Sequence, residues 1–322
     1  MQRIDHVLPW SHLGSERSLS VFRYGAGSRK VYIQASLHAD ELPGMRTAWE
    51  LKQRLNALEQ QGRLQGVIEL VPVANPIGLD QHLQGSHMGR FELGSGKNFN
   101  RAFVELSAPV AARIGEQLGS DAEANIALIR QTMGQVLDEL PAPASQLEAL
   151  HRLLLRHACD ADITLDLHCD FDAAIHIYAL PQHWPRWQSL AARLKAGVAL
   201  LCEDSGGSSF DESCSSPWLR LARAFPNAAI PRRTSPPPWN WAAWATPGLI
   251  RRRPIARRFW GFSPNRASSA ANGRRHRASA AKACRSKAPN ICSRRTMAWS
   301  VSCAMPGSGS SGATRCSKWS TR

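Results

Sequence analysis

The sequence predicts an α/β domain over residues 1–230, with a mixed or parallel sheet flanked by helices, and an aberrant basic tail of low order over residues 231–322. Two observations lead to this prediction. Up to Ile230, short continuous apolar runs alternate with segments of helical periodicity, as expected when helices cover both faces of a sheet. After Ile230 this pattern stops and the composition changes, so the two regions need separate interpretations.

The predicted strands of the first region are short runs rich in apolar and β-branched residues. They lie at residues 30–36, 66–78, 163–169, 173–180 and 199–204. Helical periodicity predicts helices at residues 43–61, 124–140, 145–158 and 184–199, the first opened by a proline. Residues 79–100 are polar and glycine-rich, which is typical of a loop that carries a site.

The charge is divided unevenly between the two regions. Residues 1–230 contain all 25 acidic residues and 21 of the 40 Lys and Arg residues, a formal charge of −4. Residues 231–322 contain the other 19 basic residues and no acid, a charge of +19. The tail also has only seven Leu, Ile, Val or Phe residues in 92, so it could bury no core and we expect it to be disordered. Yet it holds six of the eleven tryptophans, which a solvated arm does not need.

Several classes of protein are disfavoured by composition. The opening residues MQRIDHVLPW lack the basic start and apolar stretch of a signal peptide, and no apolar run is long enough to cross a bilayer. We therefore expect a cytoplasmic protein with no membrane partner. The eight cysteines form no C-x-x-C pair, which favours neither a disulfide framework nor a cysteine-based zinc site.

Three side chains suggest a metal site. His38 and Glu41 follow the first buried strand, and His168 ends the strand at 163–169. Strand ends at the carboxyl edge of the sheet are the usual place for α/β sites. Two histidines and one carboxylate leave an open position on a zinc ion, as in zinc hydrolases. An H-x-x-E pair alone is weak evidence, and the alternative is two turn residues and a core histidine.

Three motifs together carry a more specific signal. The runs SLHADELPG, NFNRAF and LDLHCD, spread over about residues 30–180, resemble the succinylglutamate desuccinylase/aspartoacylase family, relatives of the zinc carboxypeptidases. The resemblance implies a zinc carboxypeptidase-like fold and one Zn²⁺ ion bound by His38, Glu41 and His168. Family members often have H-G-N-E where this chain has H-A-D-E, a departure that keeps the ligand positions.

The resemblance also implies how a substrate is bound. In the family the N-R pair, here Asn100 and Arg101, holds a substrate carboxylate, and a guanidinium beside an amide suits that task. Arg101 could instead form a structural ion pair. Arg90, in the same loop, is a candidate for polarising the scissile carbonyl, and a solvated arginine is the alternative.

Four nearby residues have open or structural interpretations. Asp166 lies on the same strand face as His168 and could orient it, or could serve a buried role at the strand end. Cys169 and Asp170 match the family's motif, and we assign no chemistry to them. His176 lies on a predicted core strand, which favours packing over metal ligation.

The general base that the resemblance implies is missing. It should be a Glu on a late strand, but no acidic residue follows Ile230. The codons of PPPWNWAAWA (residues 236–245) offer an explanation. Read one base earlier, the bases fixed by Trp239 and Asn240 encode Glu, followed by Leu and Gly. We therefore hypothesise that the reading frame slips between about Ile230 and Ser235; a genuine basic arm is the alternative.

Two functions from different classes follow. The first is a zinc-dependent hydrolase that cleaves an amide of an N-acyl amino acid or a similar small carboxylate, impaired here because the base is lost. The second is a nucleic-acid or acidic-surface binding protein driven by the tail through phosphate neutralisation. The chain has no organised basic face or recognised module, so we expect no specific nucleic-acid partner. A serine hydrolase is disfavoured because SGGSSFDES lacks the G-x-S-x-G elbow.

Overall fold

The structure is a computed structural model that describes residues 1–10, 14–170, 173–230, 242–244 and 282–285. The chain divides into two compact units, Met1–Lys287 and Ala288–Arg322. All described residues belong to the first unit. The predictions for residues 231–322 therefore lie outside the described residues, apart from two short strands.

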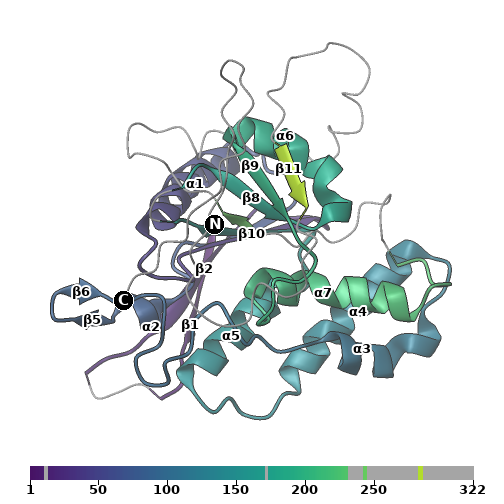
Figure 1. The fold of residues 1–322 in the computed structure, drawn as a ribbon, viewed down its shortest axis with the longest axis horizontal. Helices are drawn as coiled ribbons and strands as arrows, with labels where there is room; N and C mark the ends of the chain where they lie inside the picture. Colours follow the sequence, from purple (N-terminus) through teal and green to yellow (C-terminus); the bar gives the residue numbers. More distant parts are fainter. Residues whose placement is uncertain (11–13, 171–172, 231–241, 245–281, 286–322) are drawn as a thin grey trace, which may run out of the picture. The chain divides into compact units, whose positions relative to one another are not determined.

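The principal sheet has six strands in the order β1-β2-β4-β3-β7-β10 (Figure 1). Its strands are β1 (Gln2–Val7), β2 (Ser18–Tyr24), β4 (Val67–Val71), β3 (Lys30–Ala35), β7 (Ile163–His168) and β10 (Ala242–Trp244). β2 pairs antiparallel with both β1 and β4, whereas β3 pairs parallel with β4 and β7, and β10 pairs parallel with β7. The sheet is therefore mixed.

The remaining strands of the described residues form two smaller sheets. The parallel order β11-β9-β8 joins β11 (Lys282–Arg285), β9 (Val198–Leu201) and β8 (His176–Ala179). A hairpin of β5 (His82–Leu83) and β6 (Ser86–His87) lies within the predicted site loop at residues 79–100.

Helices cover both faces of the principal sheet (Figure 1). One face carries α1 (Leu42–Gln60) and α6 (Trp184–Leu194), and the other carries α3 (Ser107–Ile114), α4 (Ala122–Asp138), α5 (Gln146–Ala158) and α7 (Phe210–Ala224). The short helices are α2 (Pro76–Leu79), η1 (Gly115–Gln117) and η2 (Pro181–His183). Neighbouring strand residues point to opposite faces: Tyr32 belongs to the core that includes α5 and α7, and Ile33 belongs to the core that includes α1 and α6. The predicted fold class, α/β with a mixed sheet flanked by helices, is confirmed.

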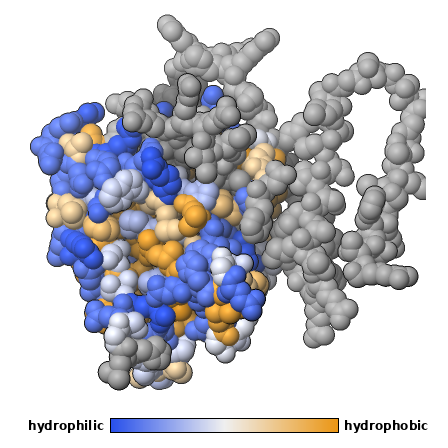
Figure 2. Space-filling view, turned by 90° about the vertical axis from the view of Figure 1, so that its left-hand side faces the viewer, coloured by the Kyte–Doolittle hydropathy of each residue, from blue (hydrophilic) through white to orange (hydrophobic). Residues whose placement is uncertain are grey.

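The face that carries α1, α2 and the β5–β6 hairpin is shown in Figure 2, where apolar side chains gather between hydrophilic ones. The exposed large apolar side chains of α1, of the hairpin and of the loop that follows it are Leu42, Trp49, Leu83, Met88, Phe91 and Leu93. Among the described helices, none has the length and apolar character needed to cross a membrane.

One glycine allows the start of α1 to pack closely on the sheet. A Cβ atom added at Gly44 would lie 2.8 Å from the carbonyl oxygen of Leu167 and 3.4 Å from the Cβ of Ala35. The N-terminal turn of α1, which follows Glu41, therefore lies directly against β3 and β7.

This close contact predicts an unusual effect of a Gly→Ala change on stability. A Gly→Ala change inside a helix normally stabilises by about 1 kcal/mol, but Gly44→Ala should destabilise the protein by about 1–3 kcal/mol because the helix must move off the sheet. Urea unfolding measures the change. Gly134→Ala in α4 is the matched control, because its nearest contact is the guanidinium of Arg156 at 3.3 Å, the mobile end of a long side chain. An increase in stability for Gly44→Ala would contradict the close packing.

Candidate metal centre

The three candidate ligands come together at the carboxyl ends of two neighbouring parallel strands. His38 follows β3, Glu41 immediately precedes α1, and His168 is the last residue of β7. All three are buried, with exposed fractions of 1%, 3% and 0%. Because β3 and β7 pair parallel, their carboxyl ends lie at the same edge of the sheet. The strand arrangement therefore accounts for the convergence of residues that are 130 positions apart.

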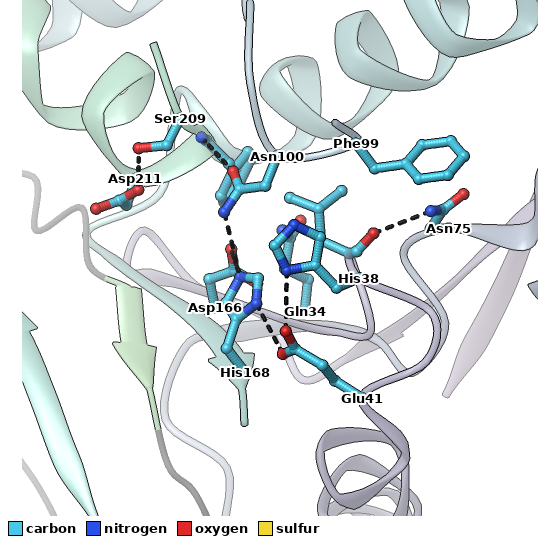
Figure 3. A network of polar contacts seen from close by, with 12 residues as sticks. Gln34, His38, Glu41, Asn75, Phe99, Asn100, Asp166, His168, Ser209 and Asp211 are labelled. Carbon is cyan, nitrogen blue, oxygen red and sulfur yellow. Dashed lines mark hydrogen bonds and ion pairs between the residues drawn. The ribbon is translucent and has the colours of Figure 1, made fainter. Parts of the chain in front are cut away.

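The carboxylate of Glu41 lies between the two imidazoles (Figure 3). Nδ1 of His38 is 2.9 Å from Oε1 of Glu41, and Nδ1 of His168 is 3.0 Å from Oε2. Potential ligand atoms of the three residues all lie within 4.8 Å of one another. Among the described residues, this is the one group of three His, Cys, Asp or Glu side chains that could hold a metal ion.

The outer nitrogen of each imidazole is held by a different oxygen. Nε2 of His38 is 2.9 Å from Oδ1 of Asn98, and Nε2 of His168 is 2.8 Å from Oδ2 of Asp166. Both partners offer acceptors, so each Nε2 can donate its proton and leave the Nδ1 lone pair for a metal ion. This arrangement matches the usual outer contacts of metal-ligating histidines.

The electrostatics of the cluster favour a positive charge at its centre. Burial lowers the pKa of His38. Burial also acts to lower the pKa of His168, but the carboxylates of Asp166 and Glu41 outweigh it and raise that pKa to about 10. Burial would raise the pKa of Glu41, yet His168 and His38 hold it well below its usual range. Two imidazoles and a carboxylate are also a donor set that zinc and related divalent ions accept. The residues therefore fit a metal ion.

Arg90 lies beside this cluster. Its guanidinium donates to Oε1 of Glu41 at 2.6 Å, and its side chain is one-quarter exposed. The loop that carries Arg90 is fixed by a hydrogen bond from the backbone N–H of Ala39 to the carbonyl of Gly89 at 2.9 Å. A Cβ at Gly89 would lie 2.2 Å from the backbone nitrogen of Asp40, so only glycine allows this approach. Arg90 therefore forms an ion pair with Glu41 and is not the solvated arginine that the sequence analysis gave as the alternative.

Asn100 also faces the cluster, and Arg101 follows it. The side-chain oxygen of Asn100 accepts from the backbone N–H of Phe210 at 2.8 Å, which turns its Nδ2 toward Nε2 of His168, 3.5 Å away. The guanidinium of Arg101 donates to the carbonyl oxygen of Asn100 at 2.6 Å. Its Cδ would be 2.7 Å from a Cβ placed on Gly207, so the side chain lies tightly along the loop before α7.

The residues left open by the sequence now have positions. Asp166 is fully buried and its Oδ2 lies 2.8 Å from Nε2 of His168, a contact through which it can orient that ring. The backbone N–H of Cys169 donates to Oε2 of Glu41 at 2.7 Å, so its side chain is not needed for that contact. His176 is buried in β8 and lies 3.6 Å from a carboxylate oxygen of Asp170, away from the three-residue cluster.

Asn98 is the site residue that the sequence analysis missed. It stands two residues before Asn100 in the NFNRAF run, and its amide oxygen supports His38 while accepting the backbone N–H of Asn100 at 2.8 Å. The sequence feature that could have identified Asn98 is its place in the NFNRAF motif, which already supplied Asn100 and Arg101 as candidates. The missing general base stays a prediction, because residues 231–241 and 245–281 lie outside the described residues.

Comparison with known proteins agrees with this geometry. Residues 27–126 match the family model of the succinylglutamate desuccinylase/aspartoacylase catalytic domain. The family resemblance is confirmed. This segment contains His38, Glu41, Arg90, Asn100 and Arg101, whereas His168 lies beyond it.

Two solved structures from Shewanella are similar to the chain. The succinylglutamate desuccinylase/aspartoacylase family protein of Shewanella amazonensis is 25% identical with a TM-score of 0.61, over 76% of this chain and 66% of that one. The protein of the same description from Shewanella frigidimarina is 24% identical with a TM-score of 0.60, over 76% and 64%. The chain thus spans slightly less than two thirds of either protein. No curated protein matches it.

The ligand assignment predicts that His168→Ala abolishes stoichiometric zinc binding, because one of three buried donors is lost. Zinc content after equilibrium dialysis is the measurement. His176→Ala is the control and should keep one zinc per chain, since His176 lies in β8 outside the cluster. Stoichiometric zinc in the His168 variant would overturn the assignment.

The orienting role of Asp166 gives a separate prediction. Asp166→Asn should weaken zinc binding about ten- to hundredfold, the usual effect of losing an outer partner of a ligating histidine. Competition with a chromophoric chelator measures the affinity. Asp162→Asn, one residue before the same strand, is the control: Asp162 pairs with Arg130 at 2.9 Å, and the change should leave zinc affinity unchanged. Equal affinities for the Asp166 variant and the wild type would remove that role.

Proposed function

We propose that the chain derives from a zinc-dependent hydrolase of the succinylglutamate desuccinylase/aspartoacylase type, which cleaves an amide of an N-acyl amino acid or a similar small carboxylate. The convergence of His38, Glu41 and His168 on one point, within a chain that matches this family, carries the proposal. The contact of Asn100 with the cluster supports the proposal, because its Nδ2 lies 3.5 Å from Nε2 of His168, and Arg101 follows it in the chain.

The proposed reaction assigns a task to each group. A zinc ion held by the three ligands would lower the pKa of a water molecule and polarise the scissile carbonyl. The amide of Asn100 and the guanidinium of Arg101 bind the substrate carboxylate, which fixes the position of the amide to be cleaved. Arg90 lies next to Glu41 and can turn its guanidinium to the carbonyl oxygen as negative charge develops there.

Proton transfer needs a further carboxylate. The water must lose a proton and the departing amine must gain one, and a single Glu within hydrogen-bond reach can do both. Among the described residues, Glu41 and Asp166 are already committed to the two histidines. We therefore propose that the base is the Glu encoded across Trp239 and Asn240 in the neighbouring frame, and that this chain lacks it.

Restoring the frame tests both parts of the proposal. A gene corrected between codons 230 and 235 should yield a zinc-dependent hydrolase of N-succinylglutamate or N-acetylaspartate, the compounds for which the family is named. The chain as printed should be slower by about 10²–10⁴-fold, the usual contribution of a general base. Amine release measured with a fluorogenic amine reagent reports the rate.

The corrected chain carries its own control. Exchange of the restored Glu for Gln should return the activity to that of the printed chain while leaving zinc content unchanged. If the corrected chain is inactive on both compounds although it binds zinc, the assigned substrate class is wrong. If the printed chain is as active as the corrected one, the base lies elsewhere.

A further inference from the structure

The segment that carries the substrate-binding residues has no regular structure of its own. Residues 98–103, here called the NFNRAF segment, include Asn98, Asn100 and Arg101 but belong to no helix and to none of the named strands. Ala102 has φ = +61°, in the left-handed region that costs a residue with a Cβ about 1 kcal/mol or more. This conformation persists only if neighbouring elements hold the segment.

One side of the segment is held by the loop before α7. The backbone N–H groups of Ala102 and Phe103 donate to the carbonyls of Gly207 and Ser208 at 2.8 and 3.0 Å. The backbone N–H of Phe210 donates to the side chain of Asn100. These contacts fix the end of the segment that follows Asn100.

The other side is held by one residue of α5. Nε2 of His151 lies 2.7 Å from the carbonyl oxygen of Phe99, and the histidine is only 7% exposed. Burial lowers the pKa of His151 to about 4, so the imidazole is neutral at pH 7 and donates through Nε2. Its ring stacks on Phe103, with centroids 3.8 Å apart and planes at 20°. Phe103 in turn meets Phe210 edge-on at 5.5 Å.

His151 therefore contacts both ends of the stretch that contains Asn100 and Arg101. The Phe99 carbonyl that it holds lies between Asn98, which supports His38, and Asn100, which faces His168. A shift of that peptide would move Asn100 and Arg101, whereas the metal ligands lie outside the segment, after β3, before α1 and at the end of β7.

We propose that His151 is a positioning residue for substrate binding: it holds the NFNRAF segment so that Asn100 and Arg101 meet the substrate carboxylate. This inference rests on the proposed function, because it concerns the carboxylate site of that reaction. It predicts that loss of the Nε2–H donor weakens carboxylate binding and leaves the metal site intact. A histidine that only filled the core would affect stability alone.

The test uses the full chain loaded with zinc, since binding does not need the missing base. Isothermal titration with N-succinylglutamate and N-acetylaspartate measures carboxylate affinity, and chelator competition measures zinc affinity. His151→Leu removes the donor, and His151→Gln keeps an N–H donor at similar reach. His157→Leu is the matched control on the same helix, because His157 contacts Glu69 and His6, each at 2.9 Å, and not the NFNRAF segment.

We expect His151→Leu to weaken carboxylate binding about tenfold, since a buried carbonyl loses its donor. His151→Gln and His157→Leu should stay within about threefold of wild type, and zinc affinity should change in none of them. Thermal unfolding confirms that each variant is folded at the titration temperature. If His151→Leu binds like wild type, or if His157→Leu is weakened equally, the positioning role is wrong.

Failure of the proposed function is distinguishable in the same experiment. If zinc-loaded wild type binds neither compound, the carboxylate site itself is absent, and the role of His151 in substrate binding falls with it. If wild type binds but His151→Gln is as weak as His151→Leu, the donor is not what matters and the inference is overturned while the carboxylate site stands.

Discussion

The site depends on the four polar contacts that surround the carboxylate of Glu41. Oε1 lies 2.9 Å from Nδ1 of His38 and accepts a hydrogen bond from the guanidinium of Arg90. Oε2 lies 3.0 Å from Nδ1 of His168 and accepts a hydrogen bond from the backbone N–H of Cys169. A buried carboxylate is tolerated only when nearby positive charges and polar groups compensate its charge and contact its lone pairs. One side chain thereby joins β3, the loop after β6, β7 and the start of α1.

Close packing around Glu41 allows the strand ends, the start of α1 and the Arg90 loop to meet. Gly44 lets the first turn of α1 lie on the carbonyl of Leu167, and Gly89 lets the Arg90 loop lie on the turn that follows His38. Asp166 and Asn98 then hold the outer nitrogens of the histidines. The edge of the sheet supplies the candidate metal ligands, and an irregular segment, held by α5 and by the loop before α7, carries the proposed substrate-binding groups. The proposal therefore predicts that metal affinity and substrate affinity can be altered separately.

Much of this could be predicted from the sequence, and the omissions have physical reasons. β3 and β7 are short runs rich in apolar residues and largely buried, so the sequence pattern predicts them as strands. β1 lies at the edge of the sheet and is largely exposed, and its polar sequence QRIDHV gives little signal. α7 contains FDESCSSPW, with Pro217 inside the helix, so local propensity opposes what tertiary packing and the Ser209–Glu212 capping box achieve.

In the site, too, some residues could be predicted from the sequence and others could not. His38 and Glu41 are three residues apart and could be paired by inspection. His168 could be proposed only from its place at the end of another buried strand, and the parallel pairing of β3 and β7 is what brings it near. Asn98 and His151 carried no signal of their own. The roles of both depend on the folded path of the NFNRAF segment, which spacing in the sequence does not encode.

X-ray absorption at the zinc edge of the metal-loaded chain tests the central claim most directly. If His38, Glu41 and His168 are the ligands, the spectrum should show two imidazoles and light oxygen or nitrogen donors at about 2.0–2.2 Å, with no sulfur. A zinc–sulfur distance of about 2.3 Å would show that a cysteine binds the metal instead. A shell without imidazole scattering would likewise contradict the account.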